Sequence, residues 1–203
     1  MNMVRLGKTE IQVSKNGFGA LPIQRITKAE AVYLLQKAFY HGINYFDTAR
    51  AYSDSEEKLG AAFPYVREKL IISTKTAAQD AKGFWADLEE SLRKLGTDYI
   101  DIYQFHNPAF CPKPGDESGL YDAALKAKEE GKIRHIGMST HNPDVAKMAA
   151  LGDEVEMILF SINPAFDLLP PTDNIENYFA ETYDESLNRI APEREELYRI
   201  CEE

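Results

Sequence analysis

The sequence lacks several features that mark whole classes of protein. Cys111 and Cys201 are its only cysteines, too few for a disulfide framework, and their surroundings match no zinc or iron–sulfur spacing. No apolar run approaches the roughly eighteen residues of a membrane helix, and the first residues have no signal-peptide core. We therefore expect a protein of the reducing cytoplasm, with no metal site and no membrane partner.

Positive charge is also scarce. The chain has 203 residues, with 23 Lys and Arg against 33 Asp and Glu, and its formal net charge is -10. No basic run offsets this balance, which excludes a nucleic-acid partner because binding to phosphates needs a basic surface. The acidic excess gathers near the end, where residues 167–203 contain eleven acidic and three basic side chains.

Short apolar runs alternate with segments of helical periodicity. A β-hairpin is expected over residues 4–14, where apolar residues alternate on both sides of Gly7. The expected strands are 17–22, 43–49, 70–76, 99–106, 133–140 and 157–163. The expected helices are 27–42, 55–63, 83–96, 119–132 and 142–152, the first with Thr27 and Glu30 as a capping box. This alternation predicts parallel strands with helices on their outer face.

Two α/β architectures fit the alternation, an open doubly wound sheet and a closed (β/α)8 barrel of the TIM type. The G-x-G-x-x-G motif of a dinucleotide-binding open sheet is missing, because no third glycine follows Gly17 and Gly19 at the required place. Polar residues also stand at the strand ends, which converge on one mouth in a barrel. These residues are Asp47, Lys75, His106, Ser139 and Asn163. The sequence therefore favours the barrel.

We expect this barrel to be incomplete. Six strand–helix units are visible in a single domain over residues 1–203, and strands seven and eight, which would close the barrel, are absent. Residues 167–191 have little periodicity and are predicted to form a long acidic loop. A last helix is expected to begin at Pro192, because proline suits the first turn of a helix.

Four polar residues together suggest a chemistry that none suggests alone. Asp47, Lys75 and His106 end three successive strands, and Tyr52 lies in the loop after the first of them. A phenol is a weak acid at pH 7, so we predict that Tyr52 gives a proton to a carbonyl oxygen and that the Lys75 ammonium makes this easier. Asp47 would keep Lys75 charged, and His106 would orient the carbonyl. A nicotinamide cofactor would supply the hydride.

Each of the four also has a structural explanation on its own. Asp47 suits a turn cap and Tyr52 a surface position, and the other two suit a solvated strand end and a structural histidine. The prediction therefore rests on their grouping. A further enzymatic hypothesis makes Lys75 a Schiff-base nucleophile, which needs an apolar pocket and a lowered pKa. A carboxylate at Asp47 works against that role.

The sequence resembles the aldo/keto reductase family. The matching stretches, in the family's order over about residues 5–166, are RLGKTEIQVSKNGFGALPIQR, GINYFDTARAYSDSEEKLG, STKT, SLRKLGTDYIDIYQFH, GKIRHIGMS and INP. GFGALPIQR and DTARAYSDSEEK resemble a bacterial branch whose full-length members often carry a C-terminal iron–sulfur segment, which this sequence does not contain. The resemblance implies a (β/α)8 barrel that reduces aldehydes and ketones with NADPH (NADP).

The resemblance also implies roles for single residues. The family's catalytic tetrad falls on Asp47, Tyr52, Lys75 and His106. Its nicotinamide-binding polar residues after strands five and six fall on Ser139 and Asn163. Ser139 equally suits a helix N-cap, and Asn163 suits a loop before proline.

Departures from the family concern the cofactor site. Thr140 stands in place of the usual Asn after Ser139, and Leu159 stands in place of a Gln on strand six. In the family, the pyrophosphate loop follows strand seven and the 2′-phosphate site follows strand eight, and both strands are absent here. Losing such charge-assisted hydrogen bonds predicts weak NADPH binding.

Two functions therefore remain open. The first is NADPH-dependent reduction of a small carbonyl compound, with residues 107–119 serving either as a substrate lid or as a plain connector. The second is a non-catalytic barrel that binds a partner, or a second copy of itself as a homo-oligomer, through the open edges of its first and sixth strands. Binding of NADPH and turnover of an aldehyde separate the two.

Overall fold

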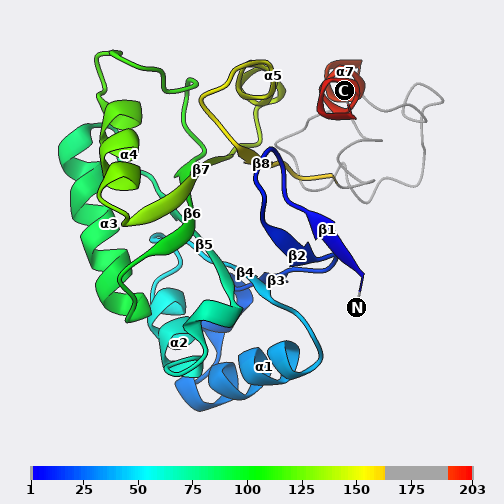
Figure 1. The fold of residues 1–203 in the computed structure, drawn as a ribbon, viewed down its shortest axis with the longest axis vertical. Helices are drawn as coiled ribbons and strands as arrows, with labels where there is room; N and C mark the ends of the chain where they lie inside the picture. The colour runs from blue at the N-terminus through cyan, green and yellow to red at the C-terminus, as the bar shows by residue number, and fades with distance from the viewer. Residues whose placement is uncertain (1, 163–191, 203) are drawn as a thin grey trace, which may run out of the picture.

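A curled parallel sheet of six strands forms the centre of the structure, a computed structural model that describes residues 2–162 and 192–202 (Figure 1). The strands are β3 (Phe18–Gly19), β4 (Tyr45–Asp47), β5 (Ile71–Thr76), β6 (Ile100–His106), β7 (Ile133–Ser139) and β8 (Met157–Leu159). They lie side by side in chain order, and every neighbouring pair is parallel. The predicted set of six parallel strands in an α/β fold is confirmed.

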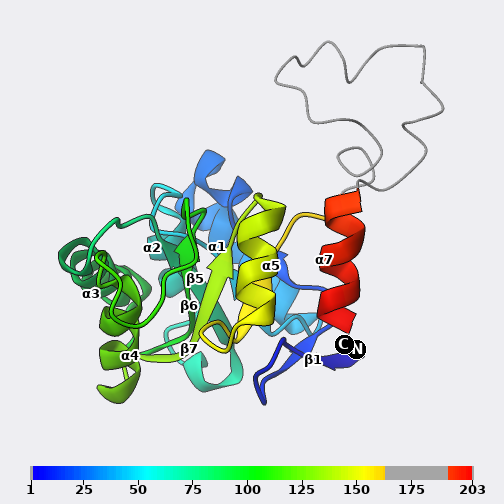
Figure 2. The same cartoon turned by 90° about the horizontal axis from the view of Figure 1, so that it is seen from above.

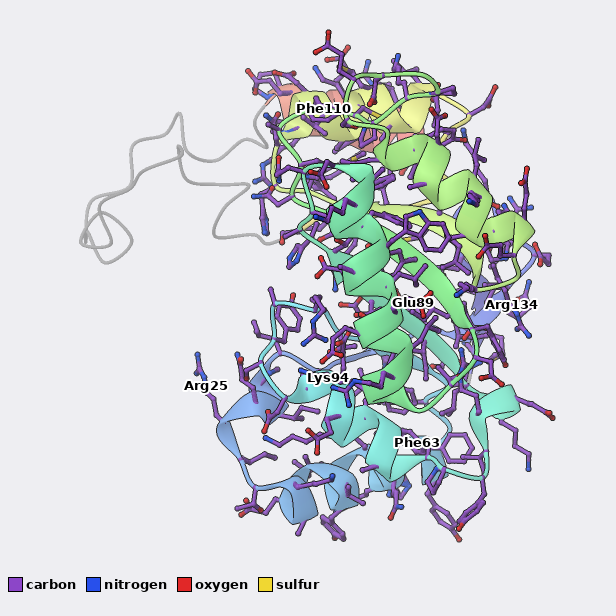
Figure 3. All side chains as sticks on the ribbon, turned by 90° about the vertical axis from the view of Figure 1, so that its left-hand side faces the viewer. Arg25, Phe63, Glu89, Lys94, Phe110 and Arg134 are labelled. Atoms are coloured by element: carbon purple, nitrogen blue, oxygen red, sulfur yellow. The ribbon has the colours of Figure 1, made fainter. Side chains whose placement is uncertain are left out.

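Helices cover the outer face of this sheet, as the alternation predicted (Figures 1 and 3). They are α1 (Lys28–Tyr40), α2 (Ser55–Ala62), α3 (Ala81–Leu95), α4 (Leu120–Glu129) and α5 (Pro143–Leu151), and a further helix, α7 (Pro192–Glu202), lies beside α5. The capping box of α1 is confirmed, since the Glu30 N–H donates to Thr27 Oγ1 and the Thr27 N–H donates to the Glu30 carboxylate. Glu89 and Lys94 mark the charged outer side of α3 (Figure 3).

The main core lies between the sheet and its helices. Phe46, Ile72 and Tyr103 on neighbouring strands are almost fully buried and belong to one apolar cluster with residues of α1 to α4. Side chains alternate between the two faces of a strand. Asp47 and Gln104, each one residue further along, therefore point to the inner face of the curled sheet. This alternation separates an apolar outer layer from a polar inner one.

The predicted hairpin is confirmed and runs across the amino ends of the parallel strands. Its two antiparallel strands are β1 (Met3–Arg5) and β2 (Gln12–Ser14). The Ser14 N–H donates to Asn44 Oδ1 just before β4 (2.7 Å), and the Lys8 N–H donates to the Glu156 carbonyl just before β8 (2.7 Å). Gly7 has φ +54, and a Cβ there would lie 2.3 Å from the Glu156 carbonyl oxygen. The hairpin thus connects two strands that the sheet itself does not pair.

The last helix, α7, begins at Pro192 as predicted and packs beside α5 (Figure 2). Lys147 of α5 donates to Glu196 (2.9 Å). Arg194 donates to the carbonyl of Ser161 just after β8 (3.0 Å). The C-terminal helix therefore lies next to the β8 end of the sheet.

All six parallel strands are shorter than the sequence pattern predicted, and β3 is among the most shortened, since it spans Phe18–Gly19 instead of residues 17–22. β4 begins at Tyr45 rather than at residue 43, and β8 ends at Leu159 rather than at residue 163. The Asn44 N–H donates to the Ser14 hydroxyl of the hairpin (3.2 Å), although the Asn44 carbonyl still accepts from the Ile71 N–H of β5 (2.8 Å). The acidic loop expected over 167–191 lies outside the described residues.

Candidate active site

The loop after β4 carries Tyr52 and is fixed by backbone hydrogen bonds. The Arg50 N–H donates to the Lys75 carbonyl on β5 (3.0 Å), and the Tyr52 N–H donates to the Ala49 carbonyl (3.0 Å). Asp47 ends β4 immediately before this loop. Because β4, β5 and β6 are adjacent and parallel, Asp47, Tyr52 and Lys75 gather at the carboxyl ends of neighbouring strands.

Lys75 and Asp47 form a buried ion pair, as predicted. Lys75 Nζ lies 2.6 Å from Asp47 Oδ2 and donates a second hydrogen bond to the Thr48 carbonyl (2.7 Å). The Lys75 side chain is 0% exposed and the Asp47 side chain 15%. A buried ammonium is costly without a partner, so the carboxylate and the carbonyl together explain why the charge is tolerated there.

Tyr52 and His106 face each other above this pair. Their ring centroids lie 5.9 Å apart at an interplanar angle of 83°, an edge-to-face contact. Lys75 Nζ lies 5.3 Å from the centroid of the Tyr52 ring. Within residues 2–162 and 192–202, no hydrogen bond joins the Tyr52 hydroxyl to Lys75 or to His106. Both groups are therefore free to bind the oxygen of a ligand.

The pKa of Tyr52 departs from the expected direction. Burial, and next the negative charge of Asp47, raise the pKa of Tyr52 above its ordinary value of 10.0. We expected Lys75 to make the phenol more acidic. The net shift runs the other way in this structure, because burial and the Asp47 carboxylate, which also pairs with Lys75, outweigh any lowering of the Tyr52 pKa by the ammonium. Tyr52 thus stays protonated at neutral pH.

The pKa values of the two basic groups are lowered. Burial lowers the pKa of Lys75, and the charge and hydrogen bond of Asp47 oppose this effect. Burial, followed by the charge of Lys75, lowers the pKa of His106, again against Asp47. A lowered lysine pKa meets one requirement of the Schiff-base hypothesis, but two acceptors already occupy the Lys75 ammonium. His106 is a neutral imidazole at pH 7, able to donate one hydrogen bond.

Gln104 belongs to the site and was missed in the sequence analysis. Its amide nitrogen donates to Asp47 Oδ1 (3.0 Å) and to the hydroxyl of Ser73. A signal was available, because Gln104 lies two residues before His106 on one strand and so shares its face. Gln104 is fully buried.

One of the two expected cofactor residues lies beside the tetrad. Ser139 ends β7 directly opposite His106 in the sheet register, and its carbonyl accepts from the Asn107 N–H (2.6 Å). Asn163 lies outside the described residues. Leu159 is opposite Ser139 on β8, so an apolar side chain occupies the position next to it.

The segment expected to serve as a lid or connector is anchored at several points. Cys111 is buried in a small apolar cluster with Met138 and residues of α5. The Asp116 carboxylate accepts hydrogen bonds from the N–H groups of Lys113, Ser118 and Gly119. These bonds fold the segment into a compact turn.

Other features of the described residues do not point to a second site. A hollow of about 400 Å³ lies at the opposite end, between the hairpin, β8 and α7, and no tetrad residue lines it. Residues 2–162 and 192–202 contain no group of three or more His, Cys, Asp or Glu side chains that could hold a metal ion. No helix in that part of the chain is long and apolar enough to span a bilayer.

Consecutive parallel strands with a polar cluster at their carboxyl ends define an α/β protein with the site geometry of barrel enzymes. Comparison with known proteins gives the particular family. The family model described as "Aldo/keto reductase family" matches residues 15–186. The chain belongs to the aldo/keto reductase family.

Individual relatives agree with this assignment. The chain is 30% identical over 184 residues to "Uncharacterized oxidoreductase YqkF" of Bacillus subtilis, covering 84% of this chain and 58% of the relative. It is 35% identical over 149 residues to "L-galactose dehydrogenase" of Arabidopsis thaliana, covering 66% and 47%. The solved holo form of aldo-keto reductase AKR11C1 from Bacillus halodurans is 28% identical, with a TM-score of 0.72 over 81% of this chain and 58% of that one. The chain thus spans about half the length of its curated relatives.

Proposed function

We propose that this chain reduces an aldehyde or ketone with NADPH, and that Tyr52 supplies the proton. The observation that carries the proposal is the grouping of the buried Lys75–Asp47 pair beneath facing Tyr52 and His106 rings. Membership of the aldo/keto reductase family supports carbonyl oxidoreduction in general. The preference for NADPH over NADH, the identity of the carbonyl compound and a cytoplasmic location belong to the proposal.

The chain's residues fit the nicotinamide end of such a cofactor in part. Ser139 ends β7 next to His106 and offers a hydroxyl to the carboxamide, whereas Leu159 on the next strand offers no polar contact. Asn163 would add a second polar contact. When bound, the nicotinamide supplies a hydride to the carbonyl carbon.

The side chains of His106 and Tyr52 then orient and protonate the carbonyl oxygen. A neutral His106 donates a hydrogen bond that orients the oxygen toward Tyr52. The Tyr52 hydroxyl transfers its proton to that oxygen as negative charge develops on it, which yields the alcohol and leaves a phenolate. Lys75, 5.3 Å from the ring centroid, stabilises this phenolate. Solvent returns the proton, and Asp47 holds Lys75 in place throughout.

The test combines cofactor binding with turnover. NADPH fluorescence is titrated against the chain, and reduction of a generic aldehyde is followed in the wild type and in Tyr52→Phe. We expect the substitution to lower turnover by about 10²-fold or more, the scale of losing a general acid. Tyr103→Phe is the matched control, because it removes a phenol on β6 that packs against Phe84 on the outer face.

Two results would contradict the proposal. The first is the absence of any NADPH binding at millimolar cofactor, which would favour the non-catalytic barrel. The second is an equal rate for the wild type and Tyr52→Phe, which would remove Tyr52 from its role.

We also propose self-association through the sheet edges. Among the described residues, β3 pairs only with β4 and β8 only with β7, so each has one edge unpaired within that part of the chain. Sedimentation equilibrium measures the mass, and a strict monomer at high concentration would contradict this part of the proposal.

A further inference from the structure

We propose that Gln104 is a positioning residue that locks the Asp47 carboxylate onto Lys75. The inference rests on the proposed function and adds a residue to its machinery. The two oxygens of Asp47 are held by donors from two different strands. Oδ2 accepts from Lys75 on β5 (2.6 Å), and Oδ1 accepts from Gln104 Nε2 on β6 (3.0 Å). The carboxylate therefore cannot rotate without breaking one of these bonds.

The orientation of the Gln104 amide is fixed by chemistry. A carboxylate only accepts hydrogen bonds, so the amide nitrogen and not its oxygen must face Asp47. The same nitrogen has a second proton, which goes to the Ser73 hydroxyl. Both N–H groups of the Gln104 amide thus have an acceptor, Asp47 on β4 and Ser73 on β5.

Stability alone gives a poor reason for a glutamine at this position. Gln104 is 0% exposed, and its oxygen Oε1 is buried without a hydrogen-bond partner among the described residues. Burying an amide oxygen without a partner is unfavourable, and an apolar side chain would avoid this cost. The feature that Gln104 gains in return is the contact with Asp47.

The opposite strand leaves room for the long side chain. Gln104 is paired in register with Gly137 on β7. A Cβ at Gly137 would lie 2.9 Å from Gln104 Cγ and 3.0 Å from Ile102 Cγ2. Gly137 thus allows Gln104 to take the conformation that reaches Asp47.

Gln104→Met in the full chain tests the proposal, since methionine keeps the length but has no donor. The readout is the titration of Tyr52, followed by the NMR signal of its ring carbon Cζ and assigned with Tyr52→Phe. Without the amide donor, the negative charge on Asp47 Oδ1 is no longer partly offset by a hydrogen bond. It therefore disfavours the Tyr52 phenolate more, and the Tyr52 titration moves to higher pH. A residue that only fills space would leave this titration unchanged.

The matched control is His135→Leu. His135 is paired in register with Ile102, which lies two residues before Gln104 and so on the same inner face. Like Gln104, His135 contacts a carboxylate, that of Glu156 (2.8 Å). It lies at the amino end of β7, away from the tetrad. We expect its loss to cost stability but to leave the Tyr52 titration at the wild-type position.

Turnover gives a second measurement. We expect Gln104→Met to lower kcat by about tenfold or more, the scale of losing a hydrogen bond to a charged group, with KM unchanged because Gln104 does not contact substrate. A chain without any turnover would refute the proposed function, and the Tyr52 titration would still decide the role of Gln104. An unshifted Tyr52 titration overturns the inference at any level of activity. If Gln104→Met does not fold, Gln104→Leu replaces it, since leucine also has no donor and adds no charge, and it should shift the titration upward too.

Discussion

The two ends of the parallel strands use charged residues in different ways. At the amino ends, Asp101 is fully buried and surrounded by donors. Arg67 lies 2.7 Å from one of its oxygens, Arg134 lies 3.0 Å from the other, and the Ile72 N–H also donates to it (2.9 Å). This carboxylate has no free position for a ligand.

A second carboxylate at the same end repeats the pattern. Glu156, just before β8, accepts hydrogen bonds from Lys128 (2.8 Å) and from the Ile136 N–H (3.0 Å), and it contacts His135 Nδ1 (2.8 Å). The hairpin lies against this end through the Glu156 carbonyl. The amino ends thus hold the sheet together.

At the carboxyl ends of the strands, one pair of charged groups is bonded and two polar groups are left without such a bond. Lys75 and Asp47 are bonded to each other, whereas the Tyr52 hydroxyl and the His106 ring have no hydrogen bond to each other in the described part of the chain. Saturated groups stabilise, and unsaturated groups at a rim can bind and react. The comparison teaches that similar residues are fully bonded at one end and leave groups open at the other, where we propose that the reaction takes place.

The largest expected effect at the carboxyl end is that of Lys75→Met. The substitution leaves the Asp47 carboxylate without its cation, which costs about 3 kcal/mol of stability. It also removes the charge that stabilises a Tyr52 phenolate, so turnover should fall about 10²-fold or more. Urea unfolding and the aldehyde assay measure the two effects.

The double variant Lys75→Met, Asp47→Asn separates those effects. Removing both buried charges should restore most of the lost stability but none of the turnover. Recovery of turnover in the double variant would show that the ion pair serves the fold alone, and the contrast between the two ends would disappear.

Asp101→Asn should have the opposite profile at the amino ends. It leaves Arg67 and Arg134 without a carboxylate, and we expect a loss of about 2 kcal/mol in urea unfolding. Turnover per folded molecule should stay the same. The exposed Asp98→Asn, three residues away, is the control and should be close to neutral. A large loss of turnover in Asp101→Asn would contradict the claim that charged residues at the amino ends contribute only to stability.

The smallest expected effect is a pH dependence from Glu156. Burial acts to raise the pKa of Glu156, but hydrogen bonds from Lys128, Ile136 and His135 outweigh it and hold the pKa below the ordinary 4.5. A carboxyl group with a lowered pKa stabilises the fold above about pH 4.5, and this stabilisation is lost as the pH falls through the folded-state pKa.

Unfolding in urea across pH 3 to 6 measures this contribution. Stability of the wild type should rise with pH over this range, and Glu156→Gln should rise less. Identical slopes for the two proteins would mean that other carboxyl groups carry the acid dependence.

Much of the fold could be predicted because its signals are local. The capping pair Thr27 and Glu30, the apolar strand cores and the hairpin around Gly7 are each read within a few residues, and all three predictions are confirmed. Strand ends were less accurate. Asn44 belongs to the predicted strand by pattern, but in the structure it bonds the distant hairpin.

Most residues of the candidate site were predicted from the sequence, but their hydrogen bonds and pKa shifts were predicted only in part. Asp47, Lys75 and His106 were placed together correctly, since neighbouring parallel strands end at one rim. The predicted direction of the Tyr52 pKa shift was wrong, because the shift depends on the burial of the phenol and on the nearby Asp47 carboxylate, which pairs with Lys75. Gln104 was missed because its spacing from His106 places it on the same face of the strand but does not show that its amide reaches Asp47.

The sequence by itself determined the order of strands and helices and the residues that stand at each strand end, because periodicity and capping act over short stretches of chain. Only the tertiary structure decided that the Gln104 amide reaches Asp47, 57 positions away, and that the hairpin connects β4 with β8. The physical reason is that hydrogen bonding, burial and charge depend on distance in space, and the chain fixes such distances only once the sheet has curled.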